Sequence, residues 1–261
     1  MNKKSILITG AASGIGRATA LFFAEKGWYV GLADINAADL AVLDSSIGPG
    51  NCCSMTMDVT DPESVASAFA VFAEKTGGAM DVLLNNAGIL EFGRFGKVPL
   101  EKSLKVVDVN FKGCLNCIHY ALKYLKKTPG ARIINMSSAS SIYGVPDLAV
   151  YSATKHALSG LTEALDIELE QYGIAVCDIQ PPFVNTPLLK TSERVYSLEK
   201  MGVKVEPPDV AKMVWKAANG KRLHWRMADT KMLNALCWLL PFAKRFVVKT
   251  LTMRPEKVIP N

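Results

Sequence analysis

The sequence has no apolar segment long enough to cross a bilayer. Its longest apolar run, residues 235–243, is interrupted by Pro241, whereas a membrane-spanning helix needs about 20 apolar residues. The first residues, Met1-Asn-Lys-Lys, lead directly into a short apolar run and then a glycine. They lack the apolar stretch and small-residue cleavage site of a secretory signal. These absences predict a cytoplasmic protein.

Histidine is scarce, and cysteine is scattered along the chain. There are three histidines and six cysteines, and the cysteines suggest reduced thiols more than a disulfide framework. Cys114-x-x-Cys117 could be a metal or redox motif, but no second pair accompanies it and it falls inside a predicted helix. We interpret it as two buried thiols and predict no metal site.

Repeats, low-complexity tracts and linkers are also missing, so we predict one domain over residues 1–261. The net charge of +6 would suit nucleic acid or an anionic membrane. It suits an anionic cofactor combined with a solvated basic face equally well. No basic run interleaved with aromatic residues occurs before residue 220. We therefore predict no nucleic-acid partner.

Short apolar segments alternate with helical patterns along most of the chain. Strands are predicted at residues 5–9, 28–34, 52–58, 81–85, 132–137 and 174–180. Helices are predicted from residue 14 and at residues 37–47, 62–76, 100–126 and 151–172. The strands are apolar throughout, which is typical of a parallel sheet covered on both faces. The sequence thus predicts an α/β fold: a single doubly wound parallel sheet with helices on both faces.

A glycine-rich turn, Thr9-Gly-Ala-Ala-Ser-Gly-Ile-Gly16, joins the first strand to the first helix. Glycine permits a tight turn and a close approach to a pyrophosphate, whose charge a helix N-terminus favours. The spacing differs from the commoner G-x-G-x-x-G. We predict that the turn binds a dinucleotide through Gly10, Ser13, Gly14, Ile15 and Gly16.

Asp34 ends the second predicted strand, eighteen residues after Gly16. A carboxylate there can accept hydrogen bonds from the adenosine ribose hydroxyls, and it repels a 2′-phosphate. Neither Ile35 nor Ser13 offers a basic side chain for such a phosphate. These residues predict NAD rather than NADP as the cofactor. Asp34 could instead be the N-cap of the following helix.

Two further strand ends fit a dinucleotide lying across the sheet. Asp58-Val59 follows the third strand, where a carboxylate could meet the adenine amino group. Asn86-Ala87-Gly88 follows the fourth, where the strand order would reverse and ligands bind. Such a loop could also be a simple turn. We predict cofactor contacts at all five residues.

Tyr151 and Lys155 lie four residues apart, on one face of a predicted helix. A tyrosine with an unperturbed pKa of about 10 is a poor base at neutral pH. A neighbouring ammonium and an oxidised nicotinamide would lower that pKa. Ser138 follows a strand end, where its hydroxyl can bind a carbonyl or alcohol oxygen. We predict that Tyr151 exchanges a proton with an alcohol or ketone while the nicotinamide exchanges a hydride.

These motifs together resemble the short-chain dehydrogenase/reductase family, over residues 4–187. The resemblance rests on Thr9-Gly10-x-x-x-Gly14-x-Gly16, Asn85-Asn-Ala-Gly88, Asn110, Ser138 and Tyr151-x-x-x-Lys155. It implies a Rossmann fold, with Ser138, Tyr151, Lys155 and Asn110 as catalytic residues. It also implies that Asn110 interrupts its helix and holds a water linking Lys155 to solvent. Lys155 would contact the nicotinamide ribose, and the helices starting near residues 100 and 151 would form a homodimer or homotetramer.

One segment departs from the family pattern. After the sixth strand the family usually has Pro-Gly-x-Val-x-Thr-Pro, whereas this chain has Pro181-Pro-Phe-Val-Asn-Thr-Pro187. The resemblance still implies cofactor contacts at Pro181, Val184 and Thr186. Pro182 in place of glycine fixes φ and biases Pro181 toward an extended shape. We predict a stiffer approach to the lid that follows.

Few residues of the sequence indicate which substrate the protein binds. Residues 188–205 are the expected lid, and six residues are candidates for an apolar wall: Phe92, Phe95, Ile142, Tyr143, Val145 and Leu148. Residues 228–261 form an apolar, basic C-terminal segment that could cover the pocket, a subunit interface or a membrane surface. We expect a lipophilic or steroid-like alcohol or ketone. The alternative is a catalytically silent nucleotide-sensing or interaction protein, although the presence of Ser138, Tyr151 and Lys155 disfavours it.

Overall fold

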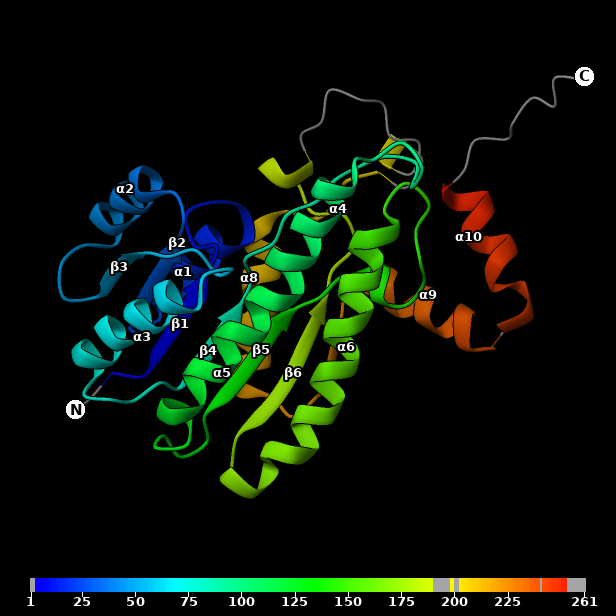
Figure 1. Ribbon diagram of the computed structural model, residues 1–261. Coiled ribbons are helices and arrows are strands. Elements are labelled where there is room, and N and C mark those ends of the chain that lie inside the picture. The colour runs from blue at the N-terminus through cyan, green and yellow to red at the C-terminus, as the bar shows by residue number, and fades with distance from the viewer. Residues whose placement is uncertain (1–2, 190–197, 200–201, 240, 253–261) are drawn as a thin grey trace, which may run out of the picture.

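The computed structural model describes residues 3–189, 198–199, 202–239 and 241–252. Within these residues, one parallel sheet of seven strands runs through the molecule in the order β3-β2-β1-β4-β5-β6-β7 (Figure 1). The strands are β1 (Ser5–Thr9), β2 (Tyr29–Asp34), β3 (Cys52–Thr56), β4 (Val82–Asn85), β5 (Arg132–Met136), β6 (Ala175–Gln180) and β7 (His224–Arg226). The longer helices are α1 (Gly14–Glu25), α2 (Ala37–Ile47), α3 (Pro62–Thr76), α4 (Leu100–Val107), α5 (Gly113–Leu125), α6 (Ala149–Leu169), α8 (Pro207–Asn219), α9 (Ala228–Leu239) and α10 (Lys244–Thr252).

The strand order reverses between β1 and β4. The chain runs outward from β1 through β2 to β3, then returns to pair β4 with the other side of β1. The loops that leave β1 and β4 therefore diverge at the carboxyl edge of the sheet, which is where ligands bind in folds of this kind. The predicted doubly wound parallel sheet is confirmed.

Helices cover both faces because successive strand residues point to opposite sides. In β1, all five residues are buried. Ile6 and Ile8 pack in a core that includes side chains of α1, α2 and α8. Leu7 packs in the opposite core, with side chains of α3, α5 and α6. Strands buried on both sides are mainly apolar, which explains the pattern in the sequence.

Four of these elements were not predicted from the sequence: α8, β7, α9 and α10. The helix α8 begins with Pro207 and buries Val210 and Val214 on the α1 side of the sheet. The strand β7 is three residues long and adds an edge to β6, with His224 opposite Asp178. The long helix predicted at residues 100–126 is divided by a π-helical turn, η1 (Asp108–Lys112), between α4 and α5.

The cysteine pair, possible metal sites and possible membrane-spanning helices were also considered from the sequence. Cys114 and Cys117 are free, buried thiols on α5, as interpreted from the sequence. In the part of the chain that the structure describes, no cluster of three or more His, Cys, Asp or Glu could hold a metal. Nor does any helix of these residues have the length and apolar character to traverse a bilayer.

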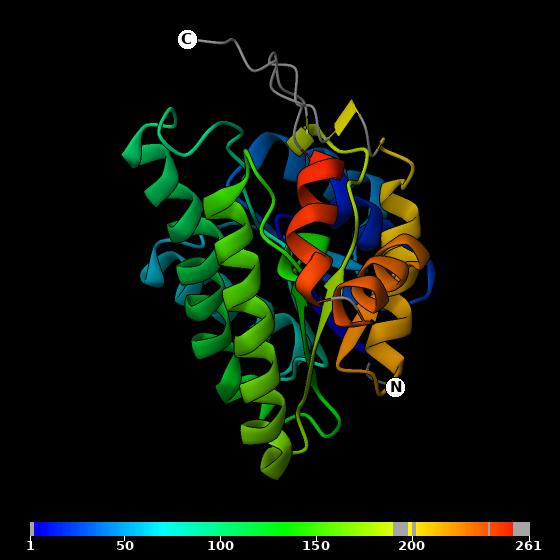
Figure 2. The same ribbon diagram turned by 90° about the vertical axis from the view of Figure 1, so that its right-hand side faces the viewer.

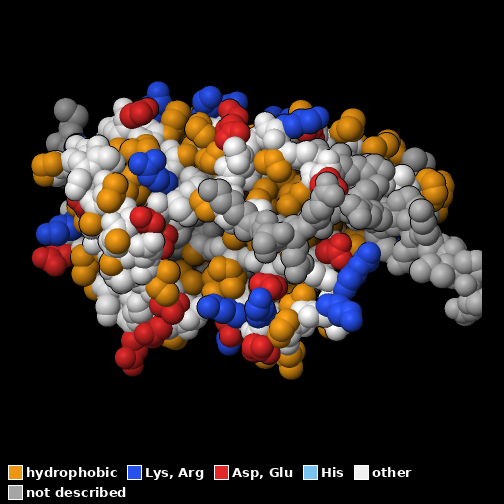
Figure 3. Space-filling view, turned by 90° about the horizontal axis from the view of Figure 1, so that it is seen from above, with side chains coloured by type: hydrophobic (Ala, Val, Ile, Leu, Met, Phe, Trp, Pro, Cys, Tyr) orange, Lys and Arg blue, Asp and Glu red, His pale blue; other side chains and the backbone are white. Residues whose placement is uncertain are grey.

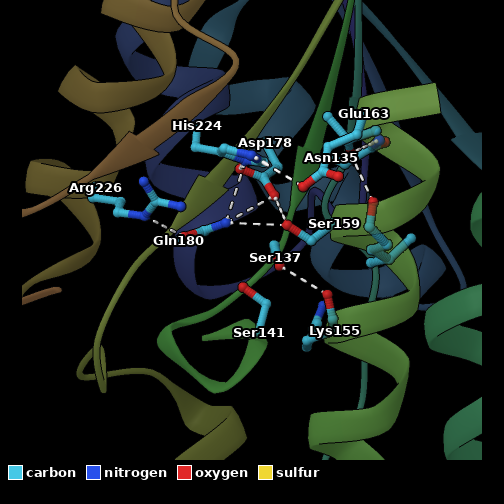
Figure 4. A network of polar contacts seen from close by, with 12 residues as sticks. Asn135, Ser137, Ser141, Lys155, Ser159, Glu163, Asp178, Gln180, His224 and Arg226 are labelled. Carbon is cyan, nitrogen blue, oxygen red and sulfur yellow. Dashed lines mark hydrogen bonds and ion pairs between the residues drawn. The ribbon is translucent and has the colours of Figure 1, made fainter. Parts of the chain in front are cut away.

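A buried polar network joins β6 and β7 to α6 (Figure 4). Asp178 is fully buried in β6, and its Oδ2 accepts hydrogen bonds from Ser159 Oγ at 2.8 Å and Gln180 Nε2 at 3.1 Å. His224 Nδ1 lies 2.9 Å from Asp178 Oδ1, and Arg226 Nε donates to Gln180 Oε1 at 2.7 Å. This network supplies the polar partners that a strand with the sequence His-Trp-Arg needs at the sheet edge.

The network predicts a pH-dependent contribution to stability from His224. Its hydrogen bond with Asp178 raises the pKa of His224 above the ordinary value of 6.5, while partial burial and nearby Arg226 oppose the rise and Glu163 adds to it. A raised folded-state pKa contributes stability that is complete below pH 6.5 and is lost as the pH rises through the folded value. We expect His224→Gln to cost about 1–2 kcal/mol at pH 6 and less at pH 9. Thermal melting of both proteins at the two pH values measures this, and an equal gap at both would contradict it.

Candidate active site

A cavity of about 520 Å³ lies at the carboxyl edge of the sheet, and residues that follow β1 to β6 line it. Most of the predicted site residues line this one cavity: Gly10, Ser13, Gly14, Ile15, Asp34, Asp58, Val59, Asn86, Ala87, Gly88, Ser138, Tyr151, Lys155, Pro181, Val184 and Thr186. Gly16 and Asn110 are not among the lining residues. The structure thus brings together motifs that are spread over more than half of the sequence.

The glycine turn is shaped for close approach. Gly10 and Gly14 have φ values of +67° and +52°, which favour glycine. A Cβ on Gly10 would lie 2.9 Å from Ala87 Cα, and one on Gly14 would lie 3.2 Å from Thr186 Cγ2. The helix α1 begins at Gly14, so its N-terminus faces the cavity and favours an anionic group there.

Gly16 has a different place from the one predicted. A Cβ on Gly16 would lie 2.0 Å from the carbonyl oxygen of Gly10, so a side chain cannot fit there. The residue does not line the cavity. Because Gly16 has no side chain, the first turn of α1 can pack directly against the backbone of Gly10. This packing explains why the residue is glycine.

Thr9 is a supporting residue that sequence reasoning missed. Its Oγ1 accepts hydrogen bonds from the backbone N–H groups of Asn86 and Ala87, both at 3.0 Å. Asn86 Nδ2 in turn donates to the carbonyl oxygens of Thr9 at 3.0 Å and Gly10 at 3.1 Å. These bonds fix the loops after β1 and β4 against each other at the point where the strand order reverses. A threonine ending an apolar strand before glycine was the available signal.

Asp34 lies at the end of β2 with its carboxylate held by backbone donors. The Ala12 N–H donates to Oδ2 and the Asn36 N–H donates to Oδ1, each at 3.0 Å. The N-cap of α2 is Asn36, whose side chain accepts from the Asp39 N–H at 3.1 Å. The alternative interpretation of Asp34 as that N-cap is therefore wrong. Asp34 faces the cavity as a fixed negative charge.

Ser138, Tyr151 and Lys155 line the cavity near the ends of β5 and β6. Ser138 caps the short helix η2 (Ala139–Ser141), and its Oγ accepts the Ser140 N–H at 3.1 Å. That bond does not use its own hydroxyl hydrogen, which can be donated to the Tyr151 oxygen or to a substrate oxygen. Lys155 is buried; its Nζ donates to the Met136 carbonyl at 2.7 Å and lies 5.5 Å from the centroid of the Tyr151 ring.

Burial determines the pKa values of this pair in the chain without cofactor. Burial raises the pKa of Tyr151 to about 12, and its interaction with the Ser138 hydroxyl opposes that rise only in part. Burial lowers the pKa of Lys155 to about 8, against a small opposing effect of Cys114. The sequence-based expectation was that the ammonium and an oxidised nicotinamide together lower the pKa of Tyr151. It stays a prediction, because these pKa values belong to the chain without cofactor and burial dominates them.

Asn110 lies on η1, so the expected interruption of the helix is present. Its side chain is buried behind the cavity, where Oδ1 accepts the Ile89 N–H at 2.8 Å and Nδ2 donates to the Ile89 carbonyl at 3.0 Å. Nδ2 also lies 3.4 Å from Thr154 Oγ1 on α6. Asn110 thus ties the loop after β4 to the helix of Tyr151. Its link to Lys155 through a water stays a prediction.

The expected apolar wall is only partly at the cavity. Leu148 lines it, while Tyr143 and Val145 form a buried cluster with Leu233 of α9 and Val248 of α10. Phe92 and Ile142 pack against that cluster, and Phe95 is exposed. The C-terminal helices therefore pack behind side chains at the catalytic end of the cavity, and none of their described residues lines it. The three alternatives for this segment stay predictions.

Other parts of the cavity were missed or lie outside the described residues. Leu188 and Leu189 of the expected lid line the cavity, as do Pro182 and Phe183, whereas residues 190–197 and 200–201 are outside the described part. Lys105 and Asp108 also line it, from α4 and η1. No motif marks these two residues, because their position depends on how the helix packs across the sheet.

Comparison with known proteins identifies the family. A family model described as short chain dehydrogenase matches residues 4–196. The chain is 34% identical over 218 residues to a cyclohexanol dehydrogenase of Acinetobacter sp. (strain SE19), covering 82% of this chain and 86% of that protein. It is 36% identical over 196 residues to a 3beta-hydroxysteroid dehydrogenase of Mediterraneibacter gnavus, covering 73% and 70%.

A solved structure agrees with these matches. The crystal structure of a 3-ketoacyl-(acyl-carrier-protein) reductase from Brucella melitensis, complexed with NADH, superimposes with a TM-score of 0.79 at 28% identity. The match covers 86% of this chain and 96% of that one. The predicted resemblance is confirmed over fold and sequence alike. The chain belongs to the short-chain dehydrogenase family, and is an oxidoreductase that acts on alcohol or ketone groups.

Proposed function

We propose that this protein interconverts an apolar secondary alcohol and its ketone with NAD(H). The observation that carries the proposal is a single cavity lined both by the carboxylate of Asp34 and by the hydroxyl-bearing residues Ser138 and Tyr151. Asp34 follows β2, whereas Ser138 follows β5, and β1 and β4 lie between those strands. A dinucleotide laid across the carboxyl edge from β2 to β5 would place its adenosine ribose near Asp34 and its nicotinamide near Tyr151.

The cavity fits such a cofactor by its backbone shape and its charge. The close approaches at Gly10 and Gly14 leave room for a pyrophosphate at the N-terminus of α1. Asp34 would bind the ribose hydroxyls. Val184 and Thr186 line the same cavity and would contact the nicotinamide, as the family resemblance implies. When bound, the nicotinamide would accept a hydride from the alcohol carbon or return one to the ketone.

Tyr151, Ser138 and Lys155 would then control the proton that is exchanged with the substrate oxygen. With its pKa raised to about 12, Tyr151 keeps its proton at neutral pH and is suited to donate it to a ketone oxygen. Ser138 would hold that oxygen by donating its hydroxyl hydrogen. Alcohol oxidation needs the phenolate, so we propose that the positive charges of Lys155 and an oxidised cofactor together lower the pKa of Tyr151.

The preference for NAD is proposed from Asp34. Asp34→Ala removes a charged acceptor, so we expect the affinity for NADH to fall about 10- to 100-fold. The affinity for NADPH should rise or stay level, because the repulsion of its 2′-phosphate disappears. Titration calorimetry with both cofactors measures this, with Glu74→Ala as the control for loss of an exposed acidic side chain on α3. Tighter binding of NADPH than NADH by the unaltered protein would contradict the assignment.

The apolar substrate is proposed from the side chains near Tyr151. Leu90, Leu148 and Phe183 line the cavity there, with Leu188 and Leu189. The names of two relatives, a cyclohexanol dehydrogenase and a 3beta-hydroxysteroid dehydrogenase, point the same way.

A series of secondary alcohols of graded size tests the whole proposal. We expect NAD-dependent kcat/KM to rise about fourfold per added buried methylene, since each contributes about 0.8 kcal/mol. A series that favours small polar or anionic alcohols would overturn the apolar assignment. Absence of any turnover despite tight NADH binding would favour a silent nucleotide-binding protein.

Assembly as a homodimer or homotetramer stays a prediction. Apolar side chains on the outer sides of α4, α5 and α6 support it, since Leu104, Leu115 and Ile167 are exposed there. These are the helices through which the family resemblance implies association.

A further inference from the structure

The outer side of α9, η5 (Pro241–Ala243) and α10 carries large apolar side chains in contact with solvent. Those of Trp238, Phe242 and Phe246 are 78%, 84% and 72% exposed, and Met232, Leu236 and Leu239 are exposed beside them. We call these six residues the C-terminal apolar surface. Figure 2 looks onto these helices and shows both on the outside of the molecule. Exposed aromatic side chains in such number indicate a binding surface.

The same helices are basic. Lys231, Arg245 and Lys249 are exposed and Lys244 is half-buried, while Asp229 is the single acidic residue between positions 228 and 252. The segment therefore carries a net charge of +3. Among the residues that the structure describes, no ion pair neutralises any of these four cations. Figure 3 shows apolar side chains on the surface at this end of the molecule, seen from the carboxyl edge of the sheet.

We propose that the C-terminal apolar surface docks on the headgroup region of an anionic lipid bilayer. Aromatic and aliphatic side chains flanked by Lys and Arg are the composition of helices that lie in a membrane interface. Anionic headgroups complement the unneutralised cations. The contact is peripheral, because none of the described helices is able to span a bilayer.

Charge favours the bilayer over a second copy of the chain. A two-fold interface places the same patch of both subunits face to face, so it would bring the cations of one copy against those of the other. Like charges brought together in an interface are unfavourable. A lipid surface carrying negative charge has no such cost.

The inner side of the same helices connects this surface with the cavity. The buried cluster that contains Leu148 also includes Leu233 and Val248, and Cys237 packs against it. Tyr151 and Phe183 pack against that cluster too and line the cavity. Docking would set the substrate end of the cavity beside the lipid, where apolar alcohols partition. That consequence rests on the proposed function, whereas the docking itself does not.

Tryptophan fluorescence tests the docking directly. Of the four tryptophans, Trp28 and Trp225 are buried and Trp215 packs against Phe22, Phe23 and Trp28, so Trp238 is the solvent-facing reporter. Vesicles of phosphatidylcholine with about one third phosphatidylglycerol should shift the emission of the full chain to shorter wavelength. The shift should be lost in Trp238→Phe. An unchanged spectrum, or a shift retained by that variant, would overturn the proposal.

Vesicle sedimentation separates the contributions of apolar area and charge. We expect Trp238→Ser/Phe242→Ser/Phe246→Ser and Lys231→Glu/Arg245→Glu/Lys249→Glu each to lower the partition coefficient at least tenfold. The matched controls are Val42→Ser/Val71→Ser and Lys127→Glu/Lys216→Glu, which change exposed residues elsewhere on the molecule and should bind normally. All the substituted side chains are exposed, so thermal melting should show folded proteins.

Other outcomes identify a different occupant. If both triple variants bind vesicles as strongly as the unaltered chain does, this surface is not the membrane site. Light scattering that shows a dimer lost only in the apolar triple variant, without vesicle binding by the unaltered chain, would assign the surface to a second copy. Vesicle binding without turnover of any alcohol would support the docking while overturning the proposed function, so the two are tested separately.

Discussion

Tyr151→Phe is expected to lower kcat for ketone reduction about 10²- to 10⁴-fold, the usual contribution of a positioned general acid. The phenyl ring keeps its place at the start of α6 and only the hydroxyl is removed, so the affinity for NADH should change by less than about threefold. Steady-state kinetics together with calorimetry of NADH binding measure both quantities. Loss of activity with binding retained would assign the proton transfer to this hydroxyl.

Tyr143→Phe provides the matched control. Tyr143 is also a buried tyrosine, and burial raises its pKa to about 12. It packs with Leu148, Leu233 and Val248 and does not line the cavity. We expect its phenylalanine variant to keep nearly full activity. A Tyr151→Phe protein with more than about a tenth of the original kcat would contradict the assignment of Tyr151 as the acid.

Asp178→Ala is expected to lower the free energy of unfolding by about 3–5 kcal/mol, the usual cost of breaking a buried charged pair. The carboxylate is fully buried and contacts Ser159, Gln180 and His224. Its removal leaves those groups without their shared acceptor and weakens the pairing of β7 with β6. Urea denaturation at pH 7 measures the loss.

An exposed aspartate serves as the comparison for that variant. Asp209→Ala removes a carboxylate from the first turn of α8, where it lies 3.6 Å from Lys212 Nζ and remains in contact with solvent. We expect a loss below about 1 kcal/mol there. Similar losses for Asp178→Ala and Asp209→Ala would show that the β6–β7 network contributes little to stability.

Much of the sheet and most of the cavity could be predicted because they depend on short, local patterns. Most of the strands β1 to β6 are short, mainly apolar runs, and the glycine turn and Tyr151-x-x-x-Lys155 have fixed, short spacings. Parallel topology then brings the carboxyl ends of these strands to one edge. Residues far apart in sequence, such as Asp34 and Ser138, were therefore placed at one cavity without any long-range information.

What could not be predicted depends on tertiary contacts. The strand β7 has only one buried residue, Trp225, and exists because His224 and Arg226 find partners in β6. The raised pKa of Tyr151 in the chain without cofactor depends on how deeply its side chain is buried. The acceptor that Lys155 reaches, the Met136 carbonyl, likewise carries no signature in the sequence. Contact geometry decides such questions after the elements are in place.

The two ends of the segment between β6 and α8 are hydrogen-bonded to each other. Val184 forms a parallel bridge with Val205, the Asn185 N–H donates to the Val205 carbonyl at 2.9 Å, and Asn185 Nδ2 donates to Glu206 Oε1 at 3.0 Å. Because the two ends are fastened together, the length of chain between them can change without moving Val184 or the start of α8. The cost of lengthening a closed loop grows only slowly with its length. We therefore expect insertions, deletions and whole-segment exchanges at residues 187–204 to change the proposed substrate contacts while leaving Val184 in its place at the cavity.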